Sequence, residues 1–236
     1  MISRSKSYIR CVLVLLAVSA FSSNVYAAYD TEKNVEVYDP LESVNRAVYG
    51  FNRFMDKILL KPVAEGYRKV VPALGRKGVR NVLNNLTEPV TFINSVLQLD
   101  RDRAFTSFWR FTLNTTFGLG GLNDFAGNTG LKLRKEDFGQ TMGTYKVGAG
   151  PYIMLPLFGP SNTRDAFGTV VDIASDPFTY TFNEYINAGR TIVKGIDTRE
   201  DTLDLTKEID RISLDPYASI RSLYTQKRKD EIKNGK

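Results

Sequence analysis

A long amphipathic helix with charges inside its apolar pattern is the feature that most limits what this chain of 236 residues can fold into. Its start at Asp39-Pro40-Leu41-Glu42 is typical of a helix N-terminus, because a capping Asp, a first-turn Pro and a third-position Glu follow in order. Apolar residues then recur at spacings of three and four, which predicts one helix face; they are Leu41, Val44, Val48, Phe51, Met55 and Ile58. Pro62 is expected to end this helix.

The predicted helix is long enough to cross a bilayer, because about 20 residues span about 30 Å. Its charges exclude a lone crossing, since each one costs roughly 2.5–3.5 kcal/mol near the bilayer centre; they are Glu42, Arg46, Arg53, Asp56 and Lys57. No segment after the first 27 residues is an uninterrupted apolar run of spanning length either. The helices are therefore expected to bury charge against one another, to face water, or to lie at an interface.

The rest of the sequence predicts a mainly α fold in a single domain. Helical patterns cover 76–86, 88–98, 101–116, 163–174 and 182–210. Asp215-Pro216 begins a further helix with the same start signal as the first. The best strand candidate is 152–157, which is expected to pair in a short hairpin. No internal repeat or low-complexity linker divides the chain.

The first 27 residues predict an export signal that is removed after translocation. Three basic residues precede the apolar run 11–21, and the small-residue sequence Val25-Tyr26-Ala27 follows it. Cleavage is expected between Ala27 and Ala28. The mature chain then divides into a linker at 28–38, a helical domain at 39–225 and a basic tail at 226–236.

Two residue types limit the chemistry available to the mature chain. The sequence contains no His, which excludes Ser-His-Asp and Cys-His catalysis and the usual zinc sites. The single cysteine, Cys11, lies in the predicted signal, so no disulfide or thiolate metal site is expected. A glycosidase with a carboxylate pair needs no His and stays open. We expect neither a metal nor a cofactor.

Charge gives no indication of nucleic-acid binding. Three of the 32 basic residues lie in the predicted signal, and five more lie in the tail at 226–236 beside two acidic residues. The body between them is nearly neutral, which argues against a nucleic-acid groove. The tail is typical of a solvated helix end, and contact with anionic lipid is the alternative.

The stretch VGAGPYIMLPLFGPSNTRD, residues 147–165, begins like a phosphate-binding glycine loop but does not continue as one. After Gly148 and Gly150, a dinucleotide loop needs a third Gly at the position that Ile153 occupies. Pro156 would also break any helix that began there. The pattern therefore favours a hairpin with an apolar tip.

Four blocks occur in one order and at natural distances: DPLESVNRAVYGFNRFMDKILLKPVAEGYRKVVP, NVLNNLTEPVTFINSVLQ, FWRFTLNTTFGLGGLNDFAG and EDFGQTMGTYKVGAGPYIMLPLFGPSNTRD. Together they resemble the MlaA (VacJ) family of outer-membrane phospholipid-transport proteins, over about residues 39–224. The resemblance implies a helical ring in the periplasmic leaflet of a Gram-negative outer membrane, with an amphipathic channel through it. It also implies removal of misplaced phospholipid from the outer leaflet, a trimeric porin as partner, and transfer to a soluble MlaC-like periplasmic carrier.

One feature departs from the family pattern. Typical members end the signal with a lipobox whose Cys is acylated, whereas Cys11 here begins the apolar run. We therefore expect no lipid anchor, and interfacial burial of apolar side chains would hold the chain at the membrane. A soluble periplasmic hydrolase or a glycan-binding helical domain is the alternative to a non-enzymatic lipid channel.

The resemblance also suggests candidates for a polar channel lining, with no catalytic residue among them. Arg110 and Asn114 lie four residues apart and share one helix face. Lys146 and Arg164 flank the glycine-proline stretch. The alternative for each of the four is a structural hydrogen bond or a surface ion pair.

The hairpin itself is a candidate gate beside the channel. Gly148 and Gly150 would let it move, Pro151 and Pro156 would stiffen its arms, and Phe158 would tolerate lipid. The alternative is a packed core hairpin. Three further glycines form a companion hinge or a helix stop; they are Gly118, Gly120 and Gly121.

Overall fold

Helices make up most of residues 37–233, the part of the chain that this computed structural model describes. The predicted signal, its cleavage site at Ala27 and Ala28, and most of the linker lie outside the described residues. The elements are α2 (Glu42–Met55), η1 (Asp56–Leu60), α3 (Lys61–Val70), α4 (Ala73–Leu97), α5 (Arg101–Thr116), α6 (Phe125–Asn128), α7 (Phe138–Thr144), β1 (Tyr152–Leu155), β2 (Gly159–Asn162), α8 (Thr163–Ser175), α9 (Pro177–Thr181), α10 (Glu184–Asp201), α11 (Leu203–Ile212) and α12 (Pro216–Ile232). The mainly α fold is confirmed.

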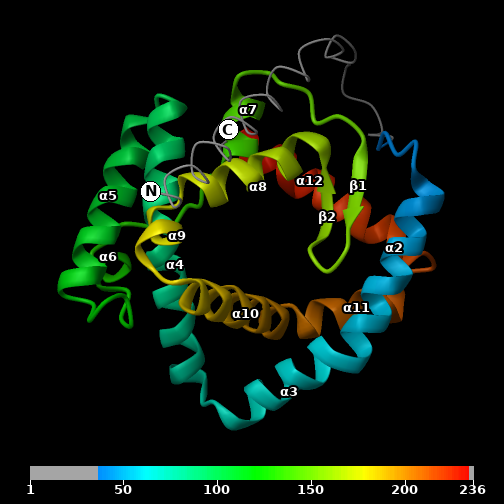
Figure 1. Ribbon diagram of the computed structural model, residues 1–236, viewed down its shortest axis with the longest axis horizontal. Helices are drawn as coiled ribbons and strands as arrows, with labels where there is room; N and C mark the ends of the chain where they lie inside the picture. The colour runs from blue at the N-terminus through cyan, green and yellow to red at the C-terminus, as the bar shows by residue number, and fades with distance from the viewer. Residues whose placement is uncertain (1–36, 234–236) are drawn as a thin grey trace, which may run out of the picture. The chain divides into compact units, whose positions relative to one another are not determined.

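These elements form a ring, because the order of packed neighbours closes on itself (Figure 1). Helix α2 packs on β1, and β2 packs on α12. Helix α12 then packs on α7, α7 on α4, and α4 on α10. Helix α10 packs on α3, which leads back through η1 to α2. Helix α5 lies outside this circuit against α4.

The first helical segment is longer than predicted, because Pro62 does not end it. A wide turn, η1, precedes Pro62, and the Lys61 N–H bonds to the Asp56 carbonyl five residues back. Pro62 then lies in the first turn of α3, where a missing N–H leaves no helix bond unmade. The helical path therefore continues to Val70.

The predicted capping box at Asp39 is wrong. Helix α2 begins at Glu42 after Leu41, and no side chain caps it. The Asp39 carboxylate instead accepts hydrogen bonds from Asn45, Tyr217 and Arg221. A tertiary contact with α12 has replaced the local cap.

Two other boundaries differ from the prediction. The helices expected at 76–86 and 88–98 form one helix, α4, which runs through Pro89. The helix expected at 182–210 divides at Thr202 into α10 and α11. Helix α5 has its predicted bounds, and the Asp100 side chain caps it by accepting from the Arg103 N–H.

The predicted hairpin forms, and its arms are packed against α2. Strands β1 and β2 pair antiparallel, with Tyr152 opposite Asn162 and Leu155 opposite Gly159. Asn45 of α2 donates to the Tyr152 carbonyl and accepts from the Met154 N–H. Asn52, two turns later, makes the same pair of bonds to the Leu155 carbonyl and the Leu157 N–H. The two asparagines thus bond to the β1 edge as a third strand would.

The described residues bury polar side chains and expose large apolar ones, which is the reverse of the usual pattern in a water-soluble protein. Few apolar side chains are buried, and most are small or aromatic; they are Ala64, Ala104, Ala126, Tyr152, Met154, Leu203, Ile209 and Tyr217. Buried polar and charged residues outnumber them, and include Glu88, Arg110, Asp197 and Glu200. Large apolar side chains instead lie exposed on nearly every helix. Such surfaces mark contact with lipid or with another protein.

Candidate functional site

Ion pairs hold α3 and α4 to α10. Arg80 contacts both Asp197 and Glu200, with nitrogen–oxygen distances of 3.0 and 3.1 Å. Arg68 donates to the same Glu200 at 2.8 Å and to its backbone carbonyl at 2.7 Å. Asp197 and Glu200 are each 5% exposed, so their charges are stable there only because arginines pair with them.

A second ion-pair cluster joins α12 to α7 and α8. Arg228 donates to Asp137 at 2.8 Å and to Asp165 at 2.9 Å. Burial alone would raise the pKa of Asp165, but the hydrogen bonds from Arg228, Tyr224 and Arg164 lower it to about 2. Arg228 lies in the predicted basic tail, and the boundary predicted after residue 225 falls inside α12.

Arg164, a predicted channel residue, belongs to this cluster. Its guanidinium donates to Asp165 at 3.0 Å and to the Val147 carbonyl at 3.2 Å. It is 8% exposed. Lys146 lies nearby at the end of α7, where it is exposed and has a φ of 62°. A lining role for either residue stays a prediction.

Arg110 and Asn114 come together as predicted, but inside the α4–α5–α6 contact. Arg110 donates to Glu88 at 2.6 Å and pairs with Asp124 at 3.0 Å. Asn114 donates to the same Asp124 and accepts from the Ala126 N–H. Both side chains are almost fully buried, and these contacts are the structural hydrogen bonds that the sequence left open as the alternative.

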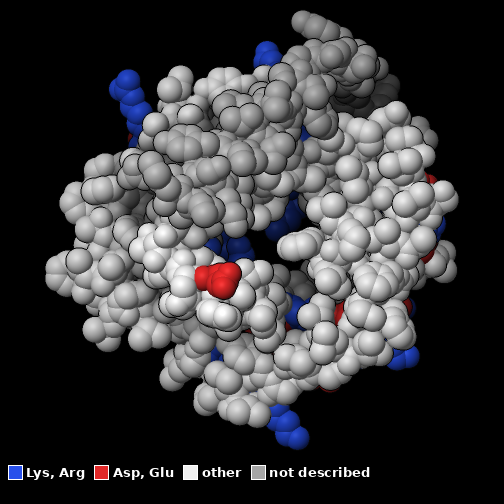
Figure 2. Space-filling view, viewed as in Figure 1, with Lys and Arg blue, Asp and Glu red and all other residues white. Residues whose placement is uncertain are grey.

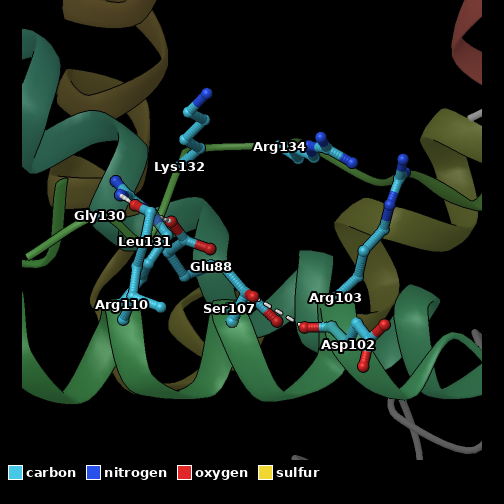
Figure 3. Close-up of a pocket in the computed structure, with 10 residues that line it drawn as sticks. Glu88, Asp102, Arg103, Ser107, Arg110, Gly130, Leu131, Lys132 and Arg134 are labelled. Carbon is cyan, nitrogen blue, oxygen red and sulfur yellow. Dashed lines mark hydrogen bonds and ion pairs between the residues drawn. The ribbon is translucent and has the colours of Figure 1, made fainter. Parts of the chain in front are cut away.

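A pocket of about 240 Å³ lies beside Arg110, between α4, α5 and the segment before α7 (Figure 3). Its lining residues are Glu88, Asp102, Arg103, Thr106, Ser107, Arg110, Gly130, Leu131, Lys132 and Arg134. Burial raises the pKa of Glu88 to about 7, despite the opposing hydrogen bond from Arg110. A larger pocket of about 840 Å³ lies between α2, η1, α3, α10 and α11.

The centre of the ring is hollowed, and Lys or Arg side chains lie deep in the hollow (Figure 2). Lys135, before α7, lies close enough to Lys194 on α10 and to Lys227 on α12 to feel their charges. Desolvation lowers the pKa of Lys135, and repulsion from Lys194 and Lys227 lowers it further. Lys135 is nevertheless exposed, which fits a side chain in a water-filled opening. Sequence reasoning missed these lysines, because nothing local distinguishes them from other surface lysines.

The predicted gate residues divide between a fixed base and an exposed tip. The Pro151 carbonyl accepts from the Thr163 N–H, which attaches the hairpin base to α8. Gly150, with a φ of 69°, lies against the Thr163 side chain, whereas Gly148 has open space around it. Pro156 and Phe158 are exposed at the tip. The turn depends on Gly159, with a φ of 84°, which the sequence analysis did not single out.

Gly118, Gly120 and Gly121 form the tight turn that follows α5. The Gly121 N–H bonds to the Asn114 carbonyl at 2.8 Å. A Cβ on Gly118 would lie 2.3 Å from the Asn123 carbonyl oxygen, so the backbone is closely packed there. These contacts are those of a helix stop, and a hinge role stays a prediction.

Many large apolar side chains are exposed, although in residues 37–233 no helix combines the length and the apolarity that a membrane crossing requires. Helix α5 alone exposes Phe105, Phe108 and Trp109. Within the same residues, no group of three or more acidic side chains is arranged to hold a metal ion.

Comparison with known proteins decides the family. The family model described as MlaA lipoprotein matches residues 37–231, which is nearly all of the ring. The chain belongs to the MlaA family. The match continues past residue 225 into the end of α12, so the MlaA region includes Arg228.

Relatives from several bacteria share this MlaA sequence. The intermembrane phospholipid transport system lipoprotein MlaA of Haemophilus influenzae is 34% identical to this chain in an alignment of 241 positions. The alignment covers 99% of this chain and 93% of that protein. The protein of the same name in Escherichia coli K12 is 39% identical over 201 residues, covering 84% of this chain and 79% of that protein. An uncharacterized protein of Rickettsia bellii is 36% identical over 231 residues, covering 96% of this chain and 91% of its own.

The fold is also shared with a solved structure. That structure, reported as "Structural basis for maintenance of bacterial outer membrane lipid asymmetry", matches with a TM-score of 0.75 at 39% identity. The match covers 82% of this chain and 98% of the solved chain. The helical ring predicted from the resemblance is therefore confirmed.

Proposed function

We propose that this chain carries phospholipid through its central opening, at the outer membrane, and so helps to maintain lipid asymmetry. The MlaA relatives are named for intermembrane phospholipid transport, and the solved relative is reported for outer-membrane lipid asymmetry. The observation that carries the proposal is a central hollow that contains Lys or Arg side chains, in a body that exposes many large apolar side chains (Figure 2).

This arrangement suits a lipid, because its two parts need different surroundings. A charged head group loses several kcal/mol of hydration when it enters hydrocarbon unpaired. We assign to this opening Lys135, Lys194 and Lys227, which lie on or next to the ring elements α7, α10 and α12; their charges would attract the phosphate while water keeps it hydrated. The acyl chains stay in contact with apolar surface, so transfer down a gradient needs no catalytic group.

Membrane position and partners belong to the same proposal. The chain would lie in the periplasmic leaflet of the outer membrane, held by its exposed apolar residues after signal cleavage. A trimeric porin would contact part of this surface, and a soluble MlaC-like carrier would receive the lipid. The direction of transfer is from the outer leaflet to the carrier.

The test compares charge reversal inside and outside the opening. Lys194→Glu should cause phospholipid to accumulate in the outer leaflet of cells that depend on this chain. Lys77→Glu, at an exposed position on α4, is the matched control and should leave the leaflet clear. The measurement is enzymatic labelling of surface phospholipid, with expression level and thermal midpoint checked for each variant.

Two results would contradict the proposal. If Lys194→Glu and Lys77→Glu keep the leaflet equally clear, the opening is not the lipid path. If the purified chain instead converts phospholipid or glycan to hydrolysis products, and one acidic substitution abolishes that turnover, the hydrolase alternative holds.

A further inference from the structure

The pocket beside Arg110 contains a buried carboxylate oxygen that accepts no hydrogen bond from the described residues. Glu88 is 1% exposed, and its Oε1 accepts from Arg110 at 2.6 Å. Its Oε2 is buried and has no hydrogen-bond partner among the described residues. Leaving such an atom unpaired costs about 1–3 kcal/mol. A ligand with an N–H donor would remove that cost.

Cations lie on the other side of the same pocket. Lys132 and Arg134 belong to the segment that crosses over α5, and both are exposed (Figure 3). Arg134 lies close enough to Arg103 that their charges repel each other. Positive groups placed in this way attract a phosphate. The pocket lining therefore combines a buried acceptor with two exposed cations.

Aromatic side chains are exposed on α5, the helix that forms one wall of the pocket. Thr106 of α5 lines the pocket, while Phe105 and Trp109 of the same helix lie outside it with ring centroids 6.0 Å apart. Phe108 packs against Trp109 at 5.6 Å. Apolar rings of this kind suit contact with acyl chains beside a polar head group.

The size of the pocket limits what it can hold. Pockets for drug-sized ligands measure about 300–1,000 Å³, and this one is smaller, at about 240 Å³. It has room for a head group but not for the two acyl chains, which would lie along the aromatic surface of α5.

We propose that the pocket formed by Glu88, Lys132 and Arg134 binds the head group of a phospholipid that carries a primary amine, with the ammonium on Glu88 and the phosphate on the two cations. This inference rests on the proposed lipid transport and names a substrate class for it. A phosphoethanolamine head group meets both requirements. A phosphocholine head group has the same phosphate but no N–H, so it cannot bond to Oε2.

The single tryptophan of the chain provides the readout, because Trp109 directly precedes Arg110, which lines the pocket. The purified chain in maltoside detergent is titrated with dihexanoyl-phosphatidylethanolamine, dihexanoyl-phosphatidylcholine and dihexanoyl-phosphatidylglycerol while Trp109 fluorescence is recorded. A hydrogen bond to a charged group predicts that the ethanolamine lipid binds roughly tenfold more tightly than the choline lipid. Free phosphoethanolamine, titrated separately, shows whether the head group binds without acyl chains.

Variants assign the two ends of the site. Glu88→Gln should bring the ethanolamine-to-choline affinity ratio close to one. Lys132→Ala combined with Arg134→Ala should weaken all three lipids and keep the ratio, and both side chains are exposed, so folding is preserved. Lys77→Ala is the matched surface control. Should Glu88→Gln fail to fold, the comparison of ethanolamine and choline lipids on the unaltered chain still decides the question.

The outcomes separate this site from lipid transport itself. Equal affinity for the ethanolamine and choline lipids would overturn the head-group inference. The inference would also fail if Lys77→Ala weakened lipid binding as much as Lys132→Ala combined with Arg134→Ala. If Trp109 fluorescence does not respond to any lipid but the chain still clears phospholipid from the outer leaflet, the site is wrong and the proposed function stands. Absence of both binding and clearance would overturn the two together.

Discussion

Asn45 and Asn52 provide a matched pair of substitutions that tests how the hairpin is held. Both are on α2, two turns apart, and each bonds to one carbonyl and one N–H of the hairpin. Asn45 is 2% exposed, whereas Asn52 is half-buried and its Leu157 partner is exposed. The difference between the two sites is therefore access to water.

The magnitude follows from what each substitution leaves unpaired. Asn45→Ala removes the partner of the Tyr152 carbonyl at 3.0 Å and of the Met154 N–H at 2.9 Å. Each buried group left unpaired costs about 1–3 kcal/mol, so Asn45→Ala should destabilise the fold by about 2–6 kcal/mol. At Asn52, water replaces the lost partners, and Asn52→Ala should cost about 1 kcal/mol.

The assay is equilibrium unfolding in detergent, followed by circular dichroism for both variants and the unaltered chain. Near-ultraviolet signal from Tyr152 and Tyr217, which pack edge to face at 6.1 Å, reports the hairpin core directly. Equal destabilisation by the two substitutions would refute the reasoning, because it would mean that burial does not set the cost of these bonds.

Three further predictions concern single residues. Gly120→Ala should destabilise the fold by about 1–2 kcal/mol, because the φ of Gly120 is +71° although the space around it is open. Gly121→Ala should destabilise the fold more, because its φ is +99° and the new Cβ would also lie 2.7 Å from the Asn85 Cβ. The thermal midpoints of the two variants test this order. Burial raises the pKa of Asp172 to about 6 from an ordinary 3.8, so its contribution to stability should be greatest below about pH 3.8 and should fall as the pH rises to about 6. Asp172→Asn should flatten that part of the unfolding profile, and an unchanged pH dependence would contradict the assignment. Phe158→Ser should change stability by less than about 0.5 kcal/mol, because Phe158 is 79% exposed, so altered lipid transfer by this variant would come from the hairpin tip itself.

Local signals in the sequence were sufficient wherever a helix end depends on its own neighbours. Asp215 caps α12 as its position predicts, since a capping side chain needs only N–H groups two or three residues ahead. The same reasoning failed at Asp39, where Tyr217 and Arg221 of α12 compete for the carboxylate. It also failed at Pro62, because a wide turn removed the conflict that would have ended the helix.

The candidate site was harder to predict than the fold, because its residues are distinguished only by their neighbours. Arg110 and Lys135 are both basic residues in a helical protein, and no pattern in the sequence separates them. Arg110 is satisfied by Glu88 and Asp124, whereas Lys135 faces two other lysines. Only the ring closure, which joins α4, α7, α10 and α12, decides which cation is neutralised and which one stays available.

The burial of polar side chains explains how the ring holds together while the side chains at the hairpin tip are exposed. An apolar exterior cannot drive the helices together within lipid, so buried ion pairs and side chain-to-backbone bonds must hold them. Such contacts fix the base of the hairpin at Pro151 and its first strand at Asn45. Asn52 also bonds to the Leu155 carbonyl and the Leu157 N–H, although the Leu157 and Phe158 side chains are exposed. A gate role for the hairpin stays a prediction, and any swing at Gly148 and Gly150 would have to break the bonds that Asn45 and Asn52 make to the hairpin.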